Sequence, residues 1–204
     1  MRILYVTDLH GRVDAYEKVL ERAAGAQVKA IVNGGDLFPL GPDLFAVQRE
    51  FVTGYLPGHL ERCAGFGLDF LSTLGNMDLC GLDDEFKRVM HAAPNAHILL
   101  EREATLEGYT FIGSPMTTDG PFSLKDRCLR DTACSAGPAQ SGKALISDRY
   151  GIHQVEDWPA MRSLRPPLSE HLAGLPEPEE RSRVIHVLHQ PPSGLGLGMT
   201  WKTK

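Results

Sequence analysis

The amino-acid sequence predicts an α/β fold built around a parallel β-sheet, and two observations support this prediction. Short, continuous apolar runs recur at residues 3–6, 30–33, 69–74 and 184–188, the pattern of strands buried on both faces of a parallel sheet. Segments with helical spacing of apolar residues separate the first three runs, so the chain begins as strand, helix, strand, helix, strand. We therefore expect functional groups beyond the carboxyl ends of these strands.

The helices are predicted from apolar residues at three- and four-residue spacing. The first runs from Val13 to Gly25, with Asp14 and Glu17 expected to form a capping box at its start. Further helical segments are expected over 43–63, divided near Gly54 and Pro57, over 83–92, and over 155–175, broken at 166–167.

The second half of the chain loses this alternation. Residues 104–106 and 109–112 indicate a β-hairpin. Residues 116–151 are rich in Gly, Ser, Thr, Asp and Pro, which predicts a loop-rich excursion rather than a second domain. We therefore expect a single domain over residues 1–204, in keeping with the usual domain size.

Composition limits the possible partners and location. No apolar run reaches the roughly 18 residues needed to cross a bilayer, and the opening segment is too short for a signal peptide, so we expect a cytoplasmic protein. The net charge of −5 argues against nucleic acid as a partner, whereas a small phosphorylated substrate remains allowed. The four cysteines form no Cys-x-x-Cys pair and are expected to be free thiols.

The run 30–33 leads into Gly34, Gly35 and Asp36, and this stretch is the centre of the functional prediction. Paired glycines allow a sharp turn and a close approach of a ligand to the backbone. By itself, Gly-Gly-Asp is equally typical of an ordinary turn. The interpretation changes because three other apolar runs also end in polar donors.

Those ends carry Asp8 and His10, Asn76 and Asp78, and His189. Carboxylate, amide and imidazole donors without thiolates suit Mn, Fe, Zn or Mg. A carboxylate such as that of Asp36 can bridge two such cations. His186, three positions before His189 on the same strand, would face the opposite way and is expected to be structural. The other histidines have no partner at ligand spacing and are expected to be surface or packing residues; they are His59, His91, His97, His153 and His171.

Taken in order, Asp8-Leu9-His10, Gly35-Asp36, Gly75-Asn76 and His189 followed by Pro191-Pro192 resemble the motifs of the calcineurin-like metallophosphoesterase family. The resemblance implies a four-layer α/β/β/α sandwich and a centre of two divalent metal ions, with manganese favoured. It implies that Asp8 and His10 bind the first ion, that Asp36 bridges, and that Asn76 and His189 bind the second. It further implies that hydroxide generated at the metals attacks phosphorus while Asn76 helps to hold the phosphate.

The third motif departs from the family pattern, which in many members reads Gly-Asn-His and supplies a proton to the leaving group. Met77 occupies the histidine position, and a thioether cannot donate a proton. Asp78 is the remaining candidate at this loop, as a catalytic residue that orients water, but at its ordinary pKa it is ionised at pH 7. Mono- or diesters are both expected substrates, with diesters or activated esters favoured.

The family's Gly-His-x-His ending does not occur among the printed residues. We therefore expect C-terminal strands of the sandwich to be missing, through a shortened chain, a frameshift or a natural truncation, and metal affinity to be reduced. Two other functions stay open. One is a non-catalytic protein-binding scaffold, as in retromer-subunit relatives; the other is a DNA-repair-type nuclease subunit, which the lack of a basic groove signature disfavours. The oligomeric state is left open.

Overall fold

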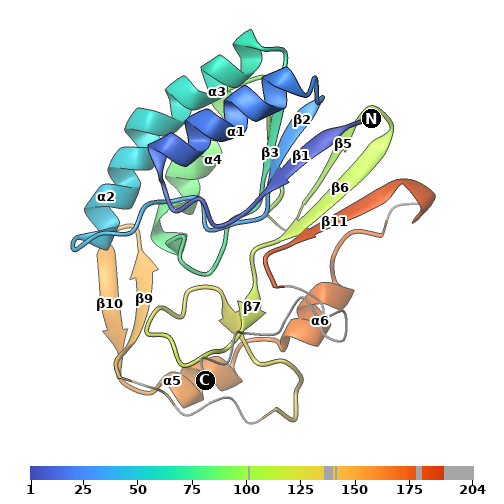
Figure 1. Ribbon diagram of the computed structural model, residues 1–204. Coiled ribbons are helices and arrows are strands. Elements are labelled where there is room, and N and C mark those ends of the chain that lie inside the picture. Colours follow the sequence, from blue (N-terminus) through green and yellow to red (C-terminus); the bar gives the residue numbers. More distant parts are fainter. Residues whose placement is uncertain (101, 136–139, 141, 178–180, 191–204) are drawn as a thin grey trace, which may run out of the picture.

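The computed structural model describes residues 1–100, 102–135, 140, 142–177 and 181–190. Its first sheet is fully parallel and follows the order of the chain (Figure 1). Its strands are β1 (Ile3–Val6), β2 (Ala30–Asn33), β3 (Asp69–Ser72) and β4 (Ala96–Ile98). The predicted parallel α/β fold is confirmed, although β3 ends two residues earlier than expected and β4 was not predicted.

Helices cover one face of this sheet, as Figure 1 shows. They are α1 (Val13–Gly25), α2 (Leu44–Glu50), the π-helical segment η1 (Phe51–Tyr55), α3 (Leu56–Gly65), the 3₁₀ turn η2 (Cys80–Leu82) and α4 (Asp83–Ala92). Between them and the sheet lies the main hydrophobic core, in which Tyr16, Leu60, Phe70 and Phe86 are fully buried. Burial of this face fixes the sheet and thereby the positions of its strand ends.

The second sheet has the order β11-β6-β5. It consists of β5 (Glu103–Leu106), β6 (Tyr109–Ser114) and β11 (Val184–Leu188), with β11 parallel and β5 antiparallel to β6. Val32 and Leu71 of the first sheet share a buried cluster with Phe111 and Val187 of the second. The two sheets therefore pack face to face, and the hairpin prediction is confirmed. The outer helical layer of a four-layer sandwich stays a prediction.

The predicted loop-rich excursion contains more regular structure than expected. It holds β7 (Thr117–Thr118), β8 (Cys128–Leu129) and β9 (Ala144–Asp148), and β10 (Gly151–Val155) begins at its last residue. Buried charges organise the segment: the Lys125 ammonium lies 2.8 Å from the Asp119 carboxylate, which also accepts a hydrogen bond from the indole of Trp158. Such long-range pairing leaves no local periodicity, so sequence patterning missed it.

The final helical prediction is confirmed in outline. The helices α5 (Trp158–Ser163) and α6 (Leu168–Ala173) flank the predicted break at residues 166–167. They are followed by the short 3₁₀ turn η3 (Arg181–Arg183). Cys63, Cys80, Cys128 and Cys134 are free thiols, as predicted. Within the described residues, no helix combines the length and apolar character required to span a bilayer.

The predicted capping box of α1 was wrong, whereas the predicted division of the second helical segment was correct. The N-cap of α1 is Arg12, which makes no side-chain capping bond, and Glu17 instead accepts hydrogen bonds from Tyr55 and Arg62. The predicted division of the second helical segment near Gly54 and Pro57 is confirmed, because the segment passes from α2 through the π-helical turn η1, which contains Gly54, into α3, which has Pro57 in its first turn. That residues 1–204 form a single domain stays a prediction.

Candidate metal centre

The loops that follow β1 and β2 lie against each other and carry three of the predicted donors. The amide of Asp8 donates to the Gly35 carbonyl at 3.0 Å, and that of His10 donates to the Asp36 carbonyl at 2.9 Å. Asp8, His10 and Asp36 have positive φ values of 56°, 47° and 52°. Such conformations are uncommon for residues other than glycine and cluster at functional sites. Local backbone strain therefore coincides with the predicted donors.

The structure brings all five predicted donors together. One donor atom each from Asp8, Asp36 and His189 lie within 4.8 Å of one another. His10 Nε2 lies 3.8 Å from Asp36 Oδ2 and 4.0 Å from Asp8 Oδ1. Asn76 Oδ1 lies 2.9 Å from His189 Nε2. Residues from three loops of the first sheet and from the end of β11 thus form one cluster.

Asp36 occupies the middle of this cluster. Its Oδ2 faces His10, whereas its Oδ1 lies 3.6 Å from His189 Nε2 and accepts a hydrogen bond from the Met77 amide. Burial raises the pKa of Asp36, an effect that His189 and the amide of Met77 partly offset. A buried carboxylate with one oxygen toward each half of the cluster is suited to bridge two cations, which would also stabilise its charge.

The hydrogen bonding of His189 is that of a metal ligand. The Gly34 carbonyl, 2.9 Å from Nδ1, can only accept, so the hydrogen is assigned to Nδ1 and Nε2 carries a lone pair. That lone pair faces Asn76 Oδ1, a second acceptor, at 2.9 Å. Ligand atoms at right angles on a cation with bonds of about 2.1 Å lie about 3 Å apart. The donor set therefore fits a divalent cation.

Two glycines leave room for this arrangement. A Cβ atom on Gly35 would lie 2.5 Å from His189 Nδ1, and one on Gly75 would lie 2.6 Å from His189 Cε1 and against the Asp36 carboxylate. Real Cβ atoms do not approach other atoms this closely. The glycines of the second and third motifs are therefore needed for space at the centre.

Asp78 does not lie in the cluster. It is fully buried, and its carboxylate accepts hydrogen bonds from the amides of Leu37, Phe38 and Gly75 at 3.0, 2.8 and 2.8 Å. Burial raises its pKa to about 6, with Asp36 adding to the shift. The geometry does not support the predicted role in orienting water. Asp78 instead joins the loop after β2 to the loop after β3.

Sequence reasoning missed Gln48, a fully buried residue of α2. Its side chain donates to the Met77 and Pro39 carbonyls and accepts from the Leu79 amide. The available signal was a polar residue on the apolar face of the helix, four positions after Leu44.

The remaining histidines lie outside the donor cluster. His59 is buried in an aromatic cluster, His97 and His153 bind Asp69 and Asp148, and His171 binds Ser114. His91 belongs to the last turn of α4.

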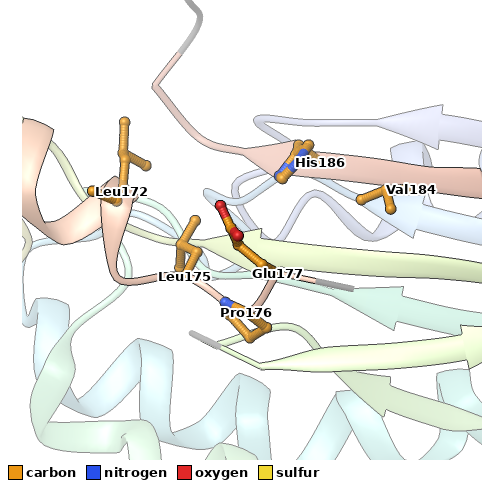
Figure 2. Close-up of a pocket in the computed structure, with 7 residues that line it drawn as sticks. Leu172, Leu175, Pro176, Glu177, Val184 and His186 are labelled. Atoms are coloured by element: carbon orange, nitrogen blue, oxygen red, sulfur yellow. The ribbon is translucent and has the colours of Figure 1, made fainter. Parts of the chain in front are cut away.

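His186 lines a cavity of about 320 Å³. Figure 2 shows this cavity between the end of α6 and β11, with Leu172 and Leu175 on one side and Val184 and His186 on the other. It is a separate feature from the candidate metal centre.

Comparison with protein families identifies the chain. The sequence profile of the calcineurin-like phosphoesterase family matches residues 1–203. The chain belongs to this family. Hydrolysis of phosphoester bonds and the binding of divalent metals are properties of that family. No curated protein matches the chain.

Several solved structures are similar to this family member. One is TT1561 of Thermus thermophilus, at 20% identity and a TM-score of 0.45, covering 58% of this chain and 52% of that one. A second is an archaeal phosphodiesterase, at 15% identity and a TM-score of 0.38, covering 56% of this chain and 58% of that one. A third is Yfce, a phosphoesterase from E. coli, at 22% identity and a TM-score of 0.32, covering 54% of this chain and 55% of that one. The chain thus spans a little over half the length of these proteins.

The motif residues Pro191 and Pro192, and the segment after them, lie outside the described residues. The metal roles of the five donors stay predictions, which the observed convergence supports.

Proposed function

We propose that this phosphoesterase family member hydrolyses phosphate esters, diesters in preference to alkyl monoesters, with two divalent cations held by the donor cluster. The observation that carries the proposal is the convergence of Asp8, His10, Asp36, Asn76 and His189 from four strand ends. Manganese as the preferred ion, and a cytoplasmic location, belong to the same proposal.

The side chains divide between two metal positions on either side of Asp36. Asp8 and His10 would hold one ion and Asn76 and His189 the other, with Asp36 shared. When bound, two divalent cations would supply Lewis acidity and lower the pKa of a water molecule, so that hydroxide is available to attack phosphorus near neutral pH. The carboxylates of Asp8 and Asp36 carry two negative charges against four positive ones. The resulting net positive charge favours a bound phosphate ester.

Two residues of the third loop shape the reaction. The Asn76 amide directs its oxygen at His189, so its nitrogen is available to donate to a phosphate oxygen. Met77, beside it, supplies a backbone amide to Asp36 but no proton for a leaving group. General acid catalysis typically contributes about 10²–10⁴-fold. Esters whose leaving group needs no proton are therefore the favoured substrates.

The experiment uses bis-p-nitrophenyl phosphate with added Mn²⁺, because its phenolate leaves without protonation. The protein is expected to turn over this diester, and Asp36→Asn is expected to lose at least about a hundredfold in kcat/KM, because a neutral amide is a weak bridge between cations. Turnover that is equal in the variant, or that persists after chelation of metal, would contradict the proposal.

A non-catalytic scaffold is the second candidate, and the observation favouring it is Met77 at the position of the proton donor. A scaffold predicts that the folded protein shows no turnover of the diester at any Mn²⁺ concentration. The same assay therefore separates the two functions.

A further inference from the structure

We infer that Gln48 is a positioning residue that fixes Asn76 relative to Asp36 and thereby sets the affinity of the second metal position. The inference rests on the proposed metal centre and extends it to a side chain on α2. The hydrogen bonds of Gln48 go to backbone groups of the donor loops rather than to the donors themselves.

The contacts of Gln48 span both donor loops. Its Nε2 donates to the Met77 carbonyl at 2.8 Å and to the Pro39 carbonyl at 3.2 Å, and its Oε1 accepts from the Leu79 amide at 3.1 Å. Pro39 lies three residues after Asp36, and Met77 directly follows Asn76. One rigid, fully buried amide therefore joins the loop of the bridging carboxylate to the loop of a terminal ligand.

Met77 transmits this restraint to the donors. Its amide donates to Asp36 Oδ1 at 2.9 Å while its carbonyl accepts from Gln48, so both of its backbone groups are held. Asn76 is the residue immediately before it. A shift of the Met77 backbone would therefore move Asn76 away from His189 Nε2, from which its oxygen now lies 2.9 Å.

Other side chains hold the rest of this loop but do not replace Gln48. Arg127 donates to the Asp78 carbonyl at 3.2 Å, and Asp126 accepts from the Cys80 amide at 2.9 Å. These contacts attach the loop to the excursion, not to the loop of Asp36. Asp78 links the two loops at their strand-proximal side, and Gln48 links them on the side that follows Asn76.

The predicted effect is selective for one metal position. Gln48→Met keeps the length of the side chain but removes its hydrogen bonds, leaving the Met77 carbonyl and the Leu79 amide without this partner. Loss of a residue that orients ligands typically weakens metal binding by about 10- to 100-fold. Asp8 and His10 are carried by the loop after β1, to which Gln48 makes no hydrogen bond, and Met77 holds the Oδ1 of Asp36 rather than the Oδ2 that faces His10, so the first position should be weakened less than the second.

Asn95 supplies a matched control. Its side-chain amide also bridges backbone groups, donating to the Leu60 and Leu68 carbonyls at 3.1 and 3.0 Å. It precedes β4 and therefore lies at the amino ends of the strands, away from the donor cluster. Asn95→Leu removes two hydrogen bonds to backbone groups, against three in Gln48→Met, at similar side-chain shape, so it reports the effect of lost stability.

The test is calorimetric titration of Mn²⁺ into the metal-free wild type, Gln48→Met and Asn95→Leu, after circular dichroism has verified folding. We expect two binding steps in the wild type, one of them about 10- to 100-fold weaker in Gln48→Met and the other within threefold. Asn95→Leu should match the wild type. Unchanged steps in Gln48→Met, or equal weakening in both variants, would overturn the inference.

Two further outcomes are distinguishable. A folded wild type that binds no Mn²⁺ would overturn the proposed metal centre, and this inference with it. If Gln48→Met does not fold, Gln48→Glu keeps the acceptor for the Leu79 amide and loses the donors to both carbonyls. The same selective weakening is then expected, and its absence counts against the role of Gln48.

Discussion

Substituting Gly75 by alanine should inactivate the centre and destabilise the fold moderately. The added methyl would lie 2.6 Å from His189 Cε1 and still closer to the backbone nitrogen and the carboxylate of Asp36. Carbon atoms in contact prefer a separation of about 3.5–4.0 Å, so the His189 ring must move about 1 Å away from the added methyl. Displacements of that size cost about a hundredfold in rate. The strain on the fold itself is about 1–3 kcal/mol.

The assay is hydrolysis of bis-p-nitrophenyl phosphate in Mn²⁺, with thermal unfolding measured on the same samples. Gly58→Ala is the matched control, because it lies inside α3 and its Cβ would meet nothing within 4 Å. That change should leave activity unaltered and raise stability by about 0.5–1 kcal/mol. Activity of Gly75→Ala within threefold of the wild type would refute the steric reasoning.

Two further predictions concern Met77 and His59. Met77→His should raise kcat/KM for an alkyl phosphate monoester by about a hundredfold, with bis-p-nitrophenyl phosphate little changed, because it restores a proton donor; a gain equal to that of Met77→Leu would contradict this. Burial lowers the pKa of His59 to about 4. The unfolded chain therefore binds a proton that the folded protein excludes between pH 6.5 and 4, so stability present above pH 6.5 is lost as the pH falls. Urea unfolding at pH 7 and 4.5 should show the wild type losing about 2 kcal/mol more than His59→Phe, and equal losses would count against a buried neutral His59.

The sequence was sufficient for those features that leave a local pattern. The continuous run at 30–33 and the glycines after it predicted both a buried strand and a close approach at its end, and β2 and Gly35 have these properties. Convergence of donors followed from topology, because parallel strands direct their carboxyl ends to one edge of a sheet.

Features that depend on distant partners could not be predicted in this way. The hairpin of β9 and β10 is stabilised by contacts such as that between Asp126 and the Ser147 amide, 21 residues apart. Nothing in the sequence around Asp78 distinguishes a catalytic carboxylate from one that accepts hydrogen bonds from three buried backbone amides. The short strand β4 has only three residues, too few for a periodic pattern.

The most direct test of the central claim is a crystal structure with Mn²⁺ and its anomalous difference map. The five donors are expected to surround two anomalous peaks, one on each side of the Asp36 carboxylate and about 3.5–4 Å apart. Manganese bound elsewhere, or a map without peaks beside Asp36 in the Mn²⁺-saturated protein, would contradict the proposed two-metal centre.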